Sequence, residues 1–327
     1  TFAVMLWRWF IDPDPAIHAQ AYAGTLLLLV ICGGTLGFAS LLSKAGHFAM
    51  MVSGSNGRRR QHERTVRTGI RILLCLLWLL GALSIVAIAI RSVAGAWRFP
   101  AVLPNGDWLT RWNDVLPAAL SVAPATLALA AATAVVGLVL VLPASEQCRN
   151  NAILRGWIGG LLFVPLLVPQ TAFLPGLQTL LLGIGADIGR TPVMLAHLLF
   201  VLPYVFLSLA DPFRAWDVRV GTVAAALNAG PDGVLWRVRI PMLLRPILTA
   251  VAVGLAVSVG QYLPTLLIGG GRVSTLTTEA VALASGGDRR AIGVYGLMQT
   301  GAALIPFACA LLIPAIVWRN RRGLRHG

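Results

Sequence analysis

Long apolar runs, separated by shorter polar segments, are the main pattern of this chain. About seven of these runs are close to 20 residues or longer, the length that an α-helix needs to cross a hydrocarbon core of about 30 Å. They cover 19–43, 72–94, 117–142, 157–181, 192–210, 246–268 and 294–318. Since a segment in lipid must satisfy its own backbone hydrogen bonds, the pattern predicts an all-α integral membrane protein with about seven transmembrane helices.

The composition agrees with this class. Hydrophobic residues make up 57% of the 327 residues and charged residues 12%, with a mean hydropathy of +0.79, whereas soluble domains carry about 25% charged residues. The formal net charge is +14, but the arginines that cause it concentrate between the apolar runs, as the positive-inside rule predicts. A nucleic-acid-binding protein would carry such charge on a contiguous soluble domain, so nucleic acid is excluded as a partner.

The basic residues also predict the orientation of the chain. They crowd the C-terminal RNRRGLRHG and the segment after the first run, where they are Lys44, Arg58, Arg59, Arg60, Arg64, Arg67 and Arg71. Both segments should be cytoplasmic, and the C-terminus with them. The 95–116 loop is rich in Trp, as is common at the outer interface, and the 211–245 segment then falls on the cytoplasmic side. The polar 53–71 stretch predicts a linker that either fixes the topology or contacts anionic membrane lipid.

The chain lacks the local motifs of an enzyme. No Gly-rich phosphate loop precedes Lys44, and the four cysteines stand far apart, without the spacing of a metal or redox site. We therefore expect no catalytic residue, no metal and no cofactor in this chain. None of the 12 Asp and Glu residues lies at the centre of an apolar run. This disfavours an ion-coupled secondary transporter, which needs intramembrane carboxylates, so any transport would take its energy from another protein.

The stretch TVAAALNAGPDGVLWRVRIP at 222–241 interrupts the apolar pattern. Thr222 is a predicted N-cap for a short helix over Val223–Leu227, which ends at Asn228–Pro231 because Pro231 cannot continue it. Pro231 can begin a second short helix, and Pro241 redirects the chain. Two short helices at an angle form a shape that docks into a groove of another protein. The alternative is a helical turn lying on the lipid surface.

This stretch resembles the "EAA" loop of binding-protein-dependent ABC importer permeases. That pattern runs Glu-Ala-Ala, three residues, Gly, and then nine to eleven residues to an apolar-x-Leu-Pro end. Anchoring on Pro241 places Thr222 at the Glu position and Asn228 at the Gly position, whereas anchoring on Gly230 places Ala224–Ala226 at Glu-Ala-Ala. We prefer the first register. The residues that the resemblance assigns to ATPase coupling are Thr222, Val223, Ala224, Asn228, Ala229, Gly230, Pro231, Trp236, Arg237 and Pro241.

The resemblance extends over the six runs from 72 to 318. With the GQYLPTLLIGGGRVSTLTTEAVALASGGDRRAIGVYGLMQ stretch, they look like the thiamine and ferric-iron branch of these permeases. That branch often fuses two six-span halves, which implies three parts here. Residues 1–44 would be the tail of an upstream half with one transmembrane helix, and 45–71 a cytoplasmic Arg-rich linker. Residues 72–327 would form a six-helix type I ABC permease domain with the coupling loop at 211–245.

The resemblance also implies partners and a location. A cytoplasmic ABC ATPase dimer would bind ATP-Mg and dock on the loop, and a periplasmic solute-binding protein would deliver the solute. A second permease half would come from upstream in the same chain or from another subunit. The protein would then be a multi-pass permease of the bacterial inner membrane that imports a thiamine-like or other small polar solute. Two other functions stay open, an ion-coupled secondary transporter and a membrane scaffold that recruits a cytoplasmic partner.

Polar side chains inside the apolar runs are candidates for the solute pathway. They are Gln170, Thr171, Gln178, His197, Tyr204, Ser258, Gln261, Tyr262, Thr265 and Gln299. Prolines near them would break the helices and open backbone groups toward a cavity. For each residue the alternative is a hydrogen bond between neighbouring helices.

Overall fold

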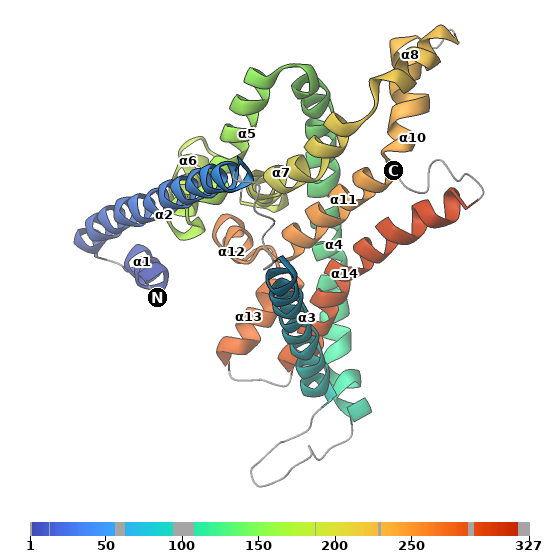
Figure 1. Ribbon diagram of the computed structural model, residues 1–327. Helices are drawn as coiled ribbons and strands as arrows, with labels where there is room; N and C mark the ends of the chain where they lie inside the picture. Colours follow the sequence, from blue (N-terminus) through green and yellow to red (C-terminus); the bar gives the residue numbers. More distant parts are fainter. Residues whose placement is uncertain are drawn as a thin grey trace.

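The computed structural model describes residues 2–12, 14–55, 63–93, 108–186, 188–227, 230–286 and 291–319. Every regular element within these ranges is a helix, which confirms the predicted all-α class (Figure 1). Five helices are long and apolar enough to cross a membrane. They lie within α2 (Pro15–Ser55), α3 (Glu63–Val93), α4 (Trp108–Asn150), α7 (Arg190–Ala215) and α14 (Ala291–Val317). A sixth span results if the helical segment 232–242 and the following α11 (Leu244–Val259), bent by 70°, are counted together.

Two of the expected spans are interrupted helices. The run at 157–181 divides into α5 (Ala152–Leu167) and α6 (Gln170–Gly183). Val168 between them is extended, with φ −85° and ψ 124°, because the ring of the following Pro169 disfavours a helical conformation there. The run at 246–268 divides into α11 and the short α12 (Leu263–Gly269). The averaged hydropathy did not reveal either break, but the prolines near Gln170 and Gln261 were expected to interrupt the helices there, and both interruptions lie beside such a proline.

The core forms where α4, α7 and α11 pack together. Buried side chains along one face of α7 include Val201, Val205 and Leu209. The neighbouring helices approach closely at Gly254 of α11, where an added Cβ would lie 3.2 Å from both the Ala134 Cβ and the Val205 Cγ2. Small residues at helix crossings allow such close packing where no aqueous hydrophobic effect drives association.

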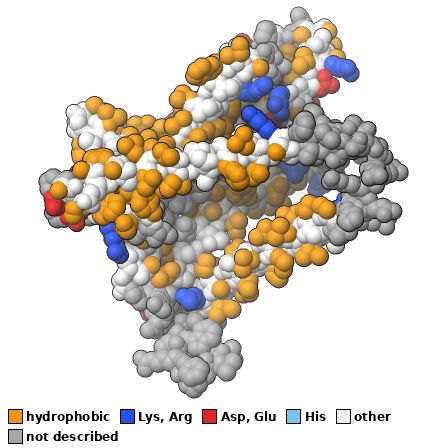
Figure 2. Space-filling model, turned by 60° about the vertical axis from the view of Figure 1, so that its left-hand side comes forward, with side chains coloured by type: hydrophobic (Ala, Val, Ile, Leu, Met, Phe, Trp, Pro, Cys, Tyr) orange, Lys and Arg blue, Asp and Glu red, His pale blue; other side chains and the backbone are white. Residues whose placement is uncertain are grey.

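The outer helices present apolar side chains on most of their surface. The apolar windows of α2 and α3 contain no buried residue, and hydrophobic side chains spread along the outer faces of the helices in Figure 2. Lipid or another apolar helix therefore has to cover them. The helix α2 begins next to α1 (Phe2–Ile11) and continues to Ser55, into the segment expected as a linker. The division of the chain at 44 and 71 stays a prediction.

The remaining short helices lie at the two ends of the molecule. The helices α8 (Val218–Ala226), α9 (Pro231–Val234) and α10 (Ile240–Met242), with the π-helix η1 (Leu235–Arg239), lie at the end where α4 leads into α5 (Figure 1). The helix α13 (Leu276–Gly286) lies toward the other end. The candidate coupling loop is therefore far from α13.

Candidate functional site

The first helix of the candidate coupling loop begins earlier than the sequence suggested. Asp217 is its N-cap, and its carboxylate accepts a hydrogen bond of 2.9 Å from the Arg219 backbone N–H. The predicted N-cap at Thr222 is wrong, since Thr222 lies inside α8 and its hydroxyl donates to the Val218 carbonyl at 3.3 Å. A carboxylate caps the positive end of a helix well. The helix is therefore one turn longer at its start than the predicted one.

The second helical piece begins at Pro231, as predicted. It continues through η1, where the Ile240 N–H donates to the Leu235 carbonyl five residues earlier. The sharp bend comes after α10 rather than at Pro241, which is the second residue of α10. Asn228 and Ala229, two predicted coupling residues between α8 and α9, lie outside the described residues.

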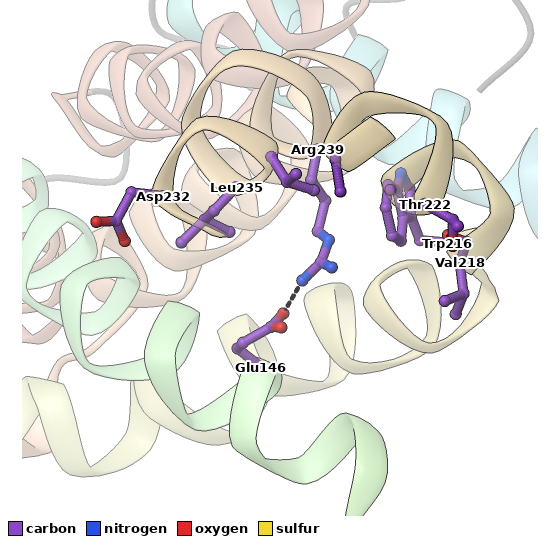
Figure 3. Close-up of a pocket in the computed structure, with 10 residues that line it drawn as sticks. Glu146, Trp216, Val218, Thr222, Asp232, Leu235 and Arg239 are labelled. Carbon is purple, nitrogen blue, oxygen red and sulfur yellow. Dashed lines mark hydrogen bonds and ion pairs between the residues drawn. The ribbon is translucent and has the colours of Figure 1, made fainter. Parts of the chain in front are cut away.

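Arg239, at the end of η1, joins the loop to two long helices. Its guanidinium pairs with the Glu146 carboxylate of α4, and its Cζ lies 4.2 Å from the centroid of the Trp216 ring, at the end of α7 (Figure 3). Only 6% of Arg239 is exposed. A buried guanidinium needs such partners, because an unpaired charge in a dry site is costly. These three residues, here named the Arg239 cluster, hold the loop against α4 and α7.

The Arg239 cluster forms part of the wall of a groove of about 560 Å³. Thr222 and Val218 lie on one side of it and Asp232 and Leu235 on the other (Figure 3). The complete lining is Glu146, Trp216, Val218, Gly221, Thr222, Ala225, Asp232, Val234, Leu235 and Arg239. The structure thus brings Thr222 next to η1, although it does not place Thr222 at a helix start.

The other predicted coupling residues lie mostly on the outer surface of the loop. Trp236 is 64% exposed and Val223 is 62% exposed. Arg237 and Gly230 are exposed too, whereas Ala224 and Pro241 are half-buried. A large exposed aromatic residue beside an arginine is typical of the anchor of a protein interface. The loop therefore has a buried inner side, centred on Arg239, and an exposed outer side, centred on Trp236.

Four of the predicted pathway residues form a buried polar cluster, here named the His197 cluster. The two ring nitrogens of His197 in α7 each lie 2.8 Å from a hydroxyl, Nδ1 from Ser258 and Nε2 from Thr265. The Gln261 side-chain N–H donates to the His197 carbonyl at 3.2 Å. The His197 cluster ties α7 to both sides of the break between α11 and α12.

The hydrogen bonds of the His197 cluster place a proton on Nε2. The Thr265 hydroxyl donates a hydrogen bond of 2.7 Å to the Gln261 backbone carbonyl, so it accepts a hydrogen bond from His197 Nε2–H. In the neutral imidazole, His197 Nδ1 accepts from the Ser258 hydroxyl. The Gln261 Oε1 atom is buried and has no hydrogen-bond partner among the described residues.

The other predicted pathway residues take no part in the hydrogen bonds of the His197 cluster that the described residues show. Gln178 lines a small pocket of about 20 Å³ between α6, α7 and α12. Gln170, Thr171, Tyr262 and Gln299 are half-buried, and Tyr204 is 39% exposed on α7. Their assignment to a pathway stays a prediction.

Sequence reasoning missed Glu146, Trp216 and Arg239. Arg239 and Glu146 are 93 residues apart in the chain, so no local motif connects them. The available signal was the isolated carboxylate of Glu146 beside the end of a long apolar run. Acidic residues near membrane spans are uncommon enough to suggest a specific partner.

Several helices long and apolar enough to cross a membrane, an interrupted helix at a buried polar cluster and an exposed helical loop at one end are typical of a multi-pass membrane permease. No protein-family model matches the chain. It is 31% identical over 172 residues to the molybdenum transport system permease protein ModB of Azotobacter vinelandii, which covers 48% of this chain and 76% of that protein. The chain belongs to the permease proteins of ABC transporters.

Two further relatives are also named as permease proteins of transport systems. The inner membrane ABC transporter permease protein YnjC of Escherichia coli K12 is 40% identical over 164 residues, which is 50% of this chain but 32% of that protein. The spermidine/putrescine transport system permease protein PotC of Haemophilus influenzae is 24% identical over 175 residues, or 54% of this chain and 65% of that protein. The chain therefore matches about a third of the length of YnjC.

Proposed function

We propose that this chain is the transmembrane subunit of an ATP-driven importer in the bacterial inner membrane. A separate cytoplasmic ATPase dimer would dock on the outer side of the coupling loop, and a periplasmic binding protein would deliver the solute. The observation that carries the proposal is the two-sided loop, with Trp236 exposed and Arg239 paired to α4. Such a loop can bind a partner on one side and move helices on the other. Hydrolysis of ATP-Mg takes place on the partner, so this chain is not itself the enzyme.

The solute pathway is proposed to pass the break between α11 and α12. Discontinuous helices at membrane depth expose backbone groups where they line a cavity. The unpartnered Gln261 Oε1 at this break is an acceptor that a solute could use. The solute class that fits is small and polar. Thiamine-like solutes remain within this proposal, as do the molybdenum and polyamine substrates in the names of ModB and PotC.

The test uses the full chain, purified with a candidate ATPase and a candidate binding protein from the same organism and reconstituted in lipid nanodiscs. Importer function predicts that the binding protein, loaded with its solute, stimulates ATP hydrolysis. A membrane scaffold would bind the ATPase without this stimulation. A secondary transporter would move solute into vesicles in response to an ion gradient, without added ATP. Either of the last two results would replace the importer proposal.

A further inference from the structure

The Arg239 cluster joins three elements by polar contacts, beside the apolar core in which α4 and α7 also pack together. Arg239 lies on the coupling loop, Glu146 on α4 and Trp216 at the end of α7. The neighbouring Arg237 on the same π-helix is exposed, whereas Arg239 is buried. Any displacement of η1 toward or away from the membrane must therefore either break this ion pair or carry Glu146 with it.

The ion pair suits this role because it is directional and protected. The Arg239 side chain is 7% exposed and that of Glu146 is 33% exposed. A charge-assisted hydrogen bond to a guanidinium fixes both distance and angle, and salt screens a partly buried pair much less than a surface pair. Stacking of the guanidinium on Trp216 fixes its plane as well. Apolar contacts alone would let the surfaces slide, since they have no preferred direction.

The helix that carries Glu146 reaches across the molecule. At 43 residues, α4 is about 65 Å long at a rise of 1.5 Å per residue. Near the middle of α4, the Thr126 hydroxyl accepts a hydrogen bond of 2.9 Å from the Leu276 N–H of α13. The adjacent Thr277 hydroxyl donates to the Val259 carbonyl, at the end of α11. Movement of Glu146 along the helix axis would therefore reach the α11–α12 break.

We infer that Glu146, Trp216 and Arg239 are positioning residues that transmit movement of the coupling loop to α4. This inference rests on the proposed function, since it requires an ATPase that moves the loop. It goes beyond that function by naming α4 as the driven helix and the buried ion pair as the connection. None of the three residues is proposed to touch the solute or the nucleotide.

The experiment measures movement of α4 directly, so it needs no knowledge of the solute. Spin labels are placed on the exposed positions Ser121 of α4 and Leu304 of α14, after the four native cysteines are replaced by alanine. The complex with its ATPase is studied in nanodiscs without nucleotide and after trapping with ATP and vanadate. The readout is the fraction of molecules in which the distance between the labels changes, together with the rate of ATP hydrolysis.

In the parent complex we expect ATP and vanadate to shift the distance. In Glu146→Gln the ratio of shifted to unshifted molecules should fall about fivefold or more, the size of a typical coupling between sites. ATPase binding and basal ATP hydrolysis should persist. The matched control is Asp211→Asn, which removes an exposed ion pair with Arg214 at the same end of α7. In this control, the fraction of molecules in which the distance between the labels changes should equal that of the parent.

Two further variants guard against misfolding and separate charge from shape. Arg239→Lys keeps the positive charge but loses the planar guanidinium that stacks on Trp216. This variant should retain part of the change in distance between the labels. The double variant Glu146→Leu/Arg239→Met removes both charges of the buried pair together, so it should fold better than a single replacement and yet lose the shift. A full shift in Glu146→Gln or in the folded double variant overturns the inference but leaves the importer proposal intact. Loss of ATPase binding in Glu146→Gln also overturns it, because the cluster would then shape the docking surface. If the parent chain binds no ATPase, both the inference about the Arg239 cluster and the importer proposal are overturned.

Discussion

Gly221 of α8 faces the indole of Trp216 so closely that an added Cβ would lie 2.8 Å from the ring atom Cη2. The ring cannot shift freely, because one of its faces carries the Arg239 guanidinium. The glycine is therefore required by close packing and not by backbone conformation. Its place in the groove wall links the position of α8 to the Arg239 cluster.

We predict that Gly221→Ala destabilises the loop and Gly230→Ala does not. Overpacking a tight contact typically costs about 1–3 kcal/mol, whereas Gly230 has no atom within 4 Å of its ideal Cβ position and no left-handed φ. The measurement is the thermal unfolding midpoint of the purified chain in detergent. Equal midpoints for the two variants would contradict the close packing of α8 on Trp216.

Trp236 should contribute to ATPase docking. Truncating an aromatic interface anchor costs about 2 kcal/mol or more, which raises Kd at least about thirtyfold. We therefore expect Trp236→Ala to reduce binding of the ATPase while the chain still inserts. The matched control is Trp78→Ala, since Trp78 is 76% exposed on the membrane helix α3. If both variants bind the ATPase like the parent, Trp236 is not part of the docking surface.

Replacing His197 should loosen α7 from the α11–α12 break. His197→Leu leaves the Ser258 and Thr265 hydroxyls buried without their nitrogen partners, and each orphaned group costs about 1–3 kcal/mol. The thermal midpoint should fall clearly. Ser208→Ala is the control on the same helix, since the half-buried Ser208 hydroxyl donates to the Tyr204 carbonyl of its own helix and to no other helix among the described residues. A similar midpoint for both variants would show that the hydrogen bonds to His197 do not stabilise the packing.

The arginine distribution predicts which side of the membrane the loops occupy. A cysteine introduced at Gly230, exposed in the coupling loop, should resist an impermeant thiol reagent in intact cells. It should react after the cells are permeabilised. A cysteine introduced at Asn105, a position outside the described residues, should react with the reagent from outside in intact cells. The reverse labelling pattern would invert the topology.

The sequence was sufficient to predict the membrane helices but not how two of them are broken. Apolar runs predicted α4, α7 and α14 well, because the requirement for an internally bonded helix in lipid leaves few alternatives. Pro169 and the Gly260–Tyr262 segment interrupt runs that are apolar on average, so the prolines nearby indicated possible interruptions but not where each helix ends. Proline alone was not a guide, since Pro117, Pro124 and Pro143 all lie inside α4.

The candidate site could be predicted only in part, for a similar reason. The start of the second short helix at Pro231 follows from local chemistry, since proline suits the first turn of a helix. The start of α8 at Asp217 was missed because Thr222 is also a good capping residue, and the sequence alone does not decide between two competing caps. The Arg239 cluster and the His197 cluster depend on pairs that only the packing of distant helices brings together.

A neutral His197 has an electrical consequence. Moving one elementary charge through the membrane field changes the free energy by about 2.3 kcal/mol per 100 mV. With a neutral imidazole, the His197 cluster holds no charge, so rearranging α7 against α11 and α12 carries none of its own charge through that field. The membrane potential would then act on this rearrangement only through the charge of whatever solute is present.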